Sequence, residues 1–189
     1  MATYQAFFDF TAQSRSVGAL MKMYGLLEKA DPVKLPLTPI VVFLAFSIES
    51  YLNSLGARAL PFWDDIERLP WKAKVNVLHT AAGRKPDWGA EPLQFAIEVF
   101  RLRDKLAHGK PERVLGPKLP DDAEPQMMIG GDALQPDWYK SITLEWVLGA
   151  KERFRLLMVY LGALFGYHES DHLHAASGGI FVDDDEPAV

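Results

Sequence analysis

The chain of 189 residues contains no cysteine. Without a thiol it can form no disulfide, no cysteine nucleophile and no thiolate metal site, and this composition fits a reducing compartment. Positive charge is also scarce, because 20 Lys and Arg stand against 25 Asp and Glu, for a net charge of −5. An acidic chain has no overall field that attracts nucleic acid, so any such binding must be local.

The chain also lacks a long uninterrupted hydrophobic run. The longest is Pro39 to Ile48, closed by Glu49, whereas a membrane-spanning helix needs about 20 apolar residues. We therefore predict a buried helix there and no membrane partner. Residues 1–10 show no basic segment followed by an apolar one, so we expect no secretory signal and a cytoplasmic location.

Helical periodicity is what the chain does contain. Hydrophobic residues make up 49% of a chain long enough for one domain with a sizeable core. Apolar side chains recur at helical spacing in five segments, namely 16–29, 38–55, 71–82, 91–108 and 141–167. Thr38 before Pro39 is typical of a helix start, and Gly56 of a helix end. We predict an all-α, up-and-down bundle of about four to five helices.

The domain boundaries follow from composition. We predict one helical domain over residues 1–176, with a long, irregular, proline-rich loop at 110–140 before the last helix. A short hairpin is expected within that loop at 126–129. The acidic residues 177–189 are expected to form a disordered tail.

The predicted fourth helix ends in Arg103-Asp104-Lys105-Leu106-Ala107-His108-Gly109. A histidine can transfer protons near neutral pH, and a guanidinium can hold two phosphate oxygens. RNA is cut when its 2′-hydroxyl attacks the adjacent phosphorus, which requires both kinds of help. The plainer alternative is that His108 caps the helix end and Arg103 forms a surface ion pair.

This motif resembles the signature of the HEPN family (higher eukaryotes and prokaryotes nucleotide-binding). In that family a polar residue follows the Arg, and the His comes after four to six residues. The buried helix that contains Glu49 also resembles the family's central helix. The resemblance covers residues 38–108 well, the last helix loosely, and neither the 110–140 loop nor the tail. It implies catalytic roles for Arg103 and His108, with Asp104 and Glu49 in support.

The implied activity is metal-independent endoribonuclease cleavage without a cofactor, leaving a cyclic phosphate and a free 5′-hydroxyl. Arg103 and His108 differ by ~140° around a helix, so they share no narrow face. Two HEPN protomers place both motifs in one cleft, so the resemblance also implies a homodimer. Arg101 satisfies the family spacing as well, with six intervening residues, but Arg103 is preferred because Asp104 follows it.

Local charge around the motif favours RNA. Six basic residues lie between positions 101 and 118, opposed only by Asp104 and Glu112. We predict that Arg101, Lys105 and Lys110 bind RNA. The alternative is a solvated helix end whose positive charge complements the helix dipole.

A second pattern lies near the end of the chain. His168-Glu169-Ser170-Asp171-His172, followed by His174, matches the H-E-x-x-H pattern of zinc proteases. A charged Asp171 is poorly suited to a helix beneath a catalytic cleft, and no strand-rich subdomain precedes it. We therefore predict a polar helix end and no metal site.

The remaining alternatives concern role and partners. Many relatives are toxins or phage-defence effectors, so an antitoxin or regulatory protein is a further expected partner. The main alternative is a catalytically inactive HEPN-like module that binds nucleotide, RNA or a protein. A third is a helical interaction protein that uses residues 110–140. For Glu49 and Asn53 a structural role is favoured, and His79 is expected to be structural.

Overall fold

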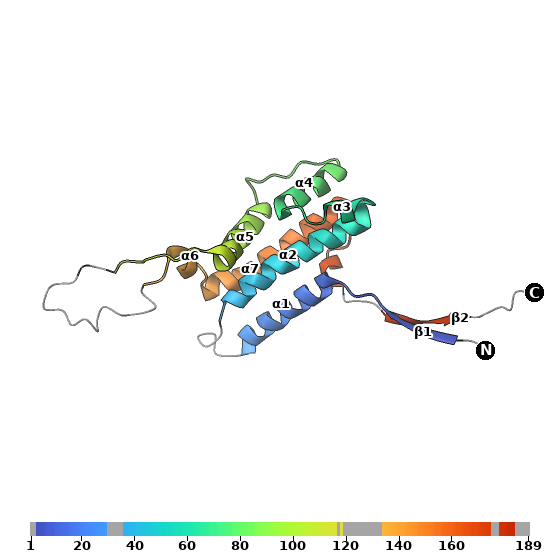
Figure 1. The fold of residues 1–189 in the computed structure, drawn as a ribbon, viewed down its shortest axis with the longest axis horizontal. Helices are drawn as coiled ribbons and strands as arrows, with labels where there is room; N and C mark the ends of the chain where they lie inside the picture. Colours follow the sequence, from blue (N-terminus) through green and yellow to red (C-terminus); the bar gives the residue numbers. More distant parts are fainter. Residues whose placement is uncertain (1–2, 30–35, 117, 119–133, 175–177, 184–189) are drawn as a thin grey trace, which may run out of the picture.

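The computed structural model describes residues 3–29, 36–116, 118, 134–174 and 178–183. Within these ranges the chain folds as a helical bundle (Figure 1), as predicted. The long helices are α1 (Ala12–Lys29), α2 (Thr38–Ala59), α5 (Leu93–His108) and α7 (Leu144–Gly162). The shorter elements are α3 (Trp63–Ile66), α4 (Trp71–Ala81), α6 (Asp137–Lys140) and the 3-10 turns η3 (Ala163–Phe165) and η4 (Asp171–Leu173).

The centre of the bundle is α2, which contacts α1, α3, α4, α5 and α7. By length and hydropathy alone α2 could cross a membrane, but most of its apolar stretch is buried against these neighbours. The prediction of a buried helix at this position is confirmed. Its apolar residues on all sides reflect helices packed around it rather than lipid.

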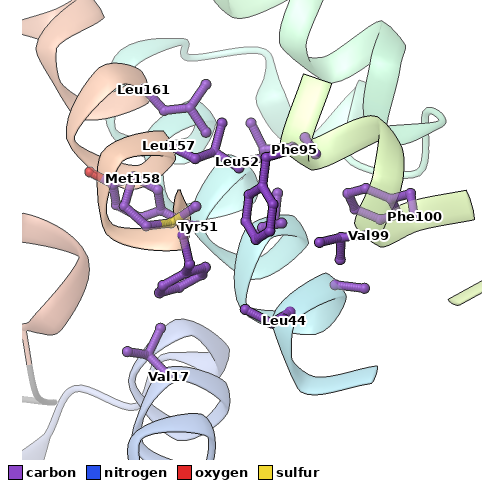
Figure 2. Close-up of a cluster of buried hydrophobic side chains, with 14 of the residues drawn as sticks. Val17, Leu44, Tyr51, Leu52, Phe95, Val99, Phe100, Leu157, Met158 and Leu161 are labelled. Atoms are coloured by element: carbon purple, nitrogen blue, oxygen red, sulfur yellow. The ribbon is translucent and has the colours of Figure 1, made fainter. Parts of the chain in front are cut away.

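The core lies where α1, α2, α5 and α7 meet, and Figure 2 shows its interlocking side chains. The labelled members are Val17 of α1, Leu44, Tyr51 and Leu52 of α2, Phe95, Val99 and Phe100 of α5, and Leu157, Met158 and Leu161 of α7. Burying a large apolar side chain stabilises a fold by roughly 1.5–3 kcal/mol. This packing fixes α5 against the bundle along most of its length.

The ends of α2 differ from the prediction. Thr38 is its first helical residue, with Leu37 at the cap position and no side-chain cap. The helix also continues past Gly56 to Ala59, so Gly56 is not its end. The indole of Trp63, from α3, occupies the space that a Cβ at position 56 would need. Gly56 is therefore required for helix-to-side-chain packing rather than for termination.

The last predicted helix is shorter than expected. Its regular part begins at Leu144, because Thr143 caps it by accepting a hydrogen bond from the backbone N–H of Trp146 at 3.0 Å. It ends at Gly162, and the chain leaves the following 3-10 turn at Gly166, which has a left-handed φ of 73°. A residue without a side chain adopts this conformation at little cost.

A two-stranded ribbon was not predicted. Strand β1 (Thr3–Phe8) pairs antiparallel with β2 (Gly178–Asp183), with Tyr4 opposite Val182. The prediction of a disordered tail is therefore wrong for residues 178–183. The two strands come from opposite ends of the chain, so no local pattern connects them. The ribbon leaves the bundle at the end opposite to that where α5 terminates (Figure 1). The hairpin predicted at 126–129 lies outside the described residues.

Candidate functional site

Contacts with α7 hold α5 in place. Glu98 of α5 accepts hydrogen bonds from Trp146 Nε1 at 2.7 Å and from an Arg153 guanidinium nitrogen at 2.8 Å. Arg153 also binds Glu91, just before α5, at 2.6 Å and lies over the ring of Phe95. These contacts fix both the position and the rotation of α5. These contacts therefore determine which side chains of α5 face solvent.

A groove of about 680 Å³ runs along this helix, and we call it the α5 groove. Its lining residues are Trp71 and Lys72 of α4, Ile97, Phe100, Arg101, Asp104, Lys105 and His108 of α5, and Gly109, Lys110 and Glu112 beyond it. Most of the α5 members recur at intervals of three or four residues, so they form one stripe along the helix. The groove combines an apolar aromatic part with a polar, mostly basic part.

His108 is the last residue of α5 and is exposed to solvent. The helix end is closed by the backbone N–H of Gly109, which donates to the carbonyl of Lys105 at 3.0 Å. The imidazole makes no hydrogen bond to any residue that the structure describes. His108 is therefore not the cap of its helix, and its ring is accessible from the groove.

The arginine that shares this groove with His108 is Arg101 rather than Arg103. Arg101 is exposed and has no ion-pair partner within the described ranges. Arg103 lies over the ring of Phe100, with its Cζ 5.2 Å from the ring centroid. Its Nε is buried and makes no hydrogen bond, although Asp104 Oδ1 is 3.3 Å away. Within one chain, Arg101 is therefore better placed than Arg103 to act together with His108.

The helix geometry explains this arrangement. Because α5 stays helical through His108, the ~140° between positions 103 and 108 is not released by an early helix end. Positions 101 and 108 differ by only ~20° after two turns, so their side chains lie on one face. The alternative arginine that the family spacing allowed is therefore the one on the same face as the histidine.

The predicted RNA-binding residues divide into two groups. Lys105 Nζ is 3.0 Å from a Glu112 carboxylate oxygen, so its charge is largely neutralised in the groove. Arg101 and Lys110 are exposed, and neither has a carboxylate partner in the part of the chain that the structure describes. Lys72, which was not among the predicted site residues, adds a further positive charge at the other end of the groove.

The aromatic part of the groove was not predicted from the sequence either. The indole of Trp71 stacks on the ring of Phe100, with centroids 4.3 Å apart and planes within 8°. Trp88 makes a T-shaped contact with the same indole at 5.7 Å, and the Lys72 ammonium lies over the Trp71 ring, 5.7 Å from its centroid. The sequence indicated only an inward position for Trp71. Its place beside α5 depends on how α4 packs, which no local spacing reveals.

Glu49 lies outside the α5 groove. Its carboxylate is 3.2 Å from the ammonium of Lys74, a residue that is only 2% exposed. The partner of Glu49 is thus Lys74 of α4 rather than Arg103, and the favoured structural role fits this contact better than the supporting one. Glu49 and Asn53 are both partly exposed, although Asn53 Oδ1 itself is buried without a hydrogen-bond partner.

The H-E-x-x-H pattern does not form a helical metal site. His168 precedes a turn and His172 lies within the short 3-10 segment η4, so the two do not share a helix face. The His168 ring is exposed and lies 2.8 Å from Ser170 Oγ, whereas the His172 ring is buried against Tyr51 and Phe154. Burial is the main reason that the pKa of His172 is lowered. Among the described residues no three His, Asp or Glu side chains are placed to hold a metal ion.

Asp171, also in this pattern, holds the C-terminal segment to the bundle. Its carboxylate accepts two hydrogen bonds from Arg58 at 2.9 and 2.7 Å and one from the Tyr51 hydroxyl at 3.0 Å. Gln13 of α1 donates to its backbone carbonyl at 3.2 Å. The Arg58 bonds, followed by that from Tyr51, lower the pKa of Asp171 despite burial. This cluster is structural.

His79 has the structural position that was expected of it. Its side chain is fully buried, with Nδ1 2.8 Å from the Val75 carbonyl and Nε2 2.7 Å from the Tyr160 hydroxyl. Burial lowers the pKa of His79, which favours the neutral ring. The hydrogen bonds tie α4 to α7 and leave no nitrogen for a ligand.

Comparison with known proteins adds no assignment: no family model matches this chain, and neither a curated protein nor a solved structure is similar to it.

Proposed function

We propose that this protein is a metal-independent endoribonuclease of the HEPN type, acting through Arg101 and His108 in the α5 groove. One observation carries the proposal: the exposed imidazole of His108 shares a groove with an arginine that has no carboxylate partner in the described ranges. Such a pair combines a proton-transferring group with a fixed positive charge, and it lies at the motif that resembles the HEPN signature.

The proposed reaction needs no group from outside the protein and the RNA. The 2′-oxygen attacks the adjacent phosphorus, the bond from phosphorus to the 5′-oxygen breaks, and a cyclic phosphate and a 5′-hydroxyl result. One proton leaves the 2′-oxygen, and one is delivered to the 5′-oxygen. Neutral His108 accepts the first, while Arg101 donates two N–H groups to the non-bridging oxygens.

The second proton transfer supports the proposal of a homodimer. A single imidazole cannot contact both the attacking and the leaving oxygen at the start of the reaction. A two-fold arrangement of two α5 grooves would supply a second His108 as the acid. Light scattering at micromolar concentration is expected to give twice the monomer mass of 21.2 kDa. A stable monomer that still cleaves RNA would refute the composite site.

Arg103 retains a part in this proposal as a positioning residue. By lying over Phe100, its guanidinium supports the ring on which the aromatic wall of the groove is built. Asp104, which lines the groove, is close enough to Arg103 to reduce the electrostatic cost of that buried position.

The alternative function is a catalytically inactive module that binds nucleotide, RNA or a protein partner through the same groove. The ion pair between Lys105 and Glu112 favours it, because it removes one of the positive charges expected beside a bound phosphate. The resemblance further suggests a toxin or phage-defence effector with an antitoxin as partner. Growth arrest on expression, relieved by His108→Ala, would support that role.

The test is incubation of the purified protein with total RNA in excess chelator, beside His108→Ala. His168→Ala is the matched control, because His168 is exposed but lies outside the α5 groove. Cleavage by the parent and by His168→Ala, with cyclic phosphate ends and loss in His108→Ala, is the expected result. Binding without cleavage by all three would favour the inactive module.

A further inference from the structure

We infer that the α5 groove takes single-stranded RNA and that Trp71 stacks on an unpaired base next to the phosphate bound by Arg101 and His108. The inference rests on the proposed function for the identity of the bound phosphate. It adds the structural class of the substrate and a base subsite formed by α4.

Trp71 presents a rigid aromatic surface. Phe100, itself only 1% exposed, covers one face of the indole in a nearly parallel stack at 4.3 Å, and Trp88 packs against the indole in a T-shaped contact at 5.7 Å. The indole is half-buried, and it lines the groove as well. A ring held in this way loses little side-chain entropy when a base stacks on it.

The groups along the groove follow a defined order. Arg101 follows Phe100, the residue beneath Trp71, directly in the chain, and His108 lies eight positions beyond Phe100, or ~12 Å along the helix axis. The aromatic end and the proton-transferring end are therefore separate, with a positive charge between them. This order suits an RNA strand whose backbone passes Arg101 while one of its bases turns toward Trp71.

A stacking surface of this kind favours single-stranded RNA over a duplex. In a duplex both faces of a base are already stacked, so Trp71 would have to displace a neighbour to reach one. Bases of a single strand are free to stack on aromatic side chains, and this contact tolerates any base. Lys72, whose ammonium lies over the Trp71 ring at 5.7 Å from its centroid, would move its flexible side chain aside for the base and place its charge beside the adjacent phosphate. An apolar peptide would gain nothing from Lys72, Arg101 and Lys110 around the same wall.

The test measures binding separately from cleavage. In a His108→Ala background, we would titrate fluorescently labelled single-stranded oligouridine, an abasic oligomer of equal length and a duplex RNA, following anisotropy. Trp71→Leu is the test variant, because leucine retains apolar volume against Phe100 but offers no ring. Trp71→Phe is the matched control that restores an aromatic face.

We expect Trp71→Leu to weaken oligouridine binding by about 5- to 160-fold, the range for loss of one stacked base. Trp71→Phe should recover most of this loss, and the abasic oligomer should bind equally to all three proteins. Equal oligouridine affinity in a folded Trp71→Leu variant would overturn the stacking subsite. Equal affinity of the parent for duplex and single strand would overturn the substrate class.

The outcomes also separate the two proposals. If the parent cuts RNA but Trp71→Leu binds as tightly as the parent, the ribonuclease proposal stands and the subsite fails. If the parent never cuts RNA but its binding depends on Trp71, the subsite stands and the catalytic proposal fails. If both Trp71 variants unfold, equal affinity of the parent background for oligouridine and the abasic oligomer overturns the subsite, and a preference for oligouridine supports it.

Discussion

Arg101 and His108 lie seven residues apart on α5 and line the same groove. Two turns of helix bring their side chains to within ~20° of each other around the axis and ~10 Å apart along it, so a phosphate that contacts both would have to lie between them. Arg103, two residues away from Arg101, lies over Phe100 instead. Because the two arginines face different sides of α5, their contributions to activity can be measured separately by mutation.

Replacement of each arginine should therefore affect cleavage differently. We expect Arg101→Ala to lower the rate of RNA cleavage at saturating RNA by about 10²- to 10³-fold, in the range for loss of one group that stabilises transition-state charge. Arg103→Ala should lower it by much less and should also destabilise the fold, because Arg103 packs on Phe100. The measurement is single-turnover cleavage with excess protein, together with thermal unfolding. The opposite ranking would restore Arg103 as the catalytic arginine.

Gly56 and Gly149 provide a matched pair of helical glycines. In Gly56→Ala the new methyl group would meet the Trp63 indole, so we expect a loss of about 1–3 kcal/mol in the free energy of unfolding. Gly149→Ala, in open space on α7, should instead gain roughly 0.5–1 kcal/mol from the better helix propensity of alanine. Urea denaturation of both variants measures this. An unchanged free energy of unfolding in Gly56→Ala would mean that α3 moves aside without cost.

Asp171→Asn tests the attachment of the C-terminal segment. The variant loses the charge that accepts two hydrogen bonds from Arg58 and one from Tyr51. We expect a loss of about 2 kcal/mol in the free energy of unfolding, less than for a fully buried ion pair because the Arg58 side chain is 39% exposed. Glu169→Gln, an exposed neighbour, is the control. An unchanged midpoint in denaturant for Asp171→Asn would show that this cluster contributes little.

The fold should lose stability in mildly acidic solution. Burial lowers the pKa of His79 and that of His172 below the ordinary value of 6.5. The native state then binds fewer protons than the unfolded state, so the free energy of unfolding falls as the pH drops below about 6.5. The fall can reach about 1.4 kcal/mol per pH unit for each histidine and stops below the folded pKa.

Denaturation in urea between pH 7.5 and 5 measures that slope. His172→Phe keeps an aromatic ring between Tyr51 and Phe154 but removes one titrating group, so its slope should be smaller. His168→Ala, at an exposed position, should keep the parent slope. A His172→Phe slope equal to that of the parent would show that His172 does not contribute.

The helices could be predicted from the sequence because their signals are local. Apolar spacing located α2, α4 and α5 to within a few residues, since each helix buries one repeating set of side chains. The motif that carries the proposed site was placed at the end of this helix for the same reason. The sequence could not decide between Arg101 and Arg103, because the family pattern fixes the spacing along the chain and not the face that α5 turns to solvent.

What the sequence determined by itself is therefore the all-α class, the buried α2 and the motif at the end of α5. Tertiary structure decided the rest. The stack of Trp71 on Phe100 joins α4 to α5, the pairing of Tyr4 with Val182 joins the two ends of the chain, and the contact of Trp63 with Gly56 converts an expected helix end into a packing site. Each depends on residues that are distant in sequence or on side-chain volume, and neither is encoded in a local period.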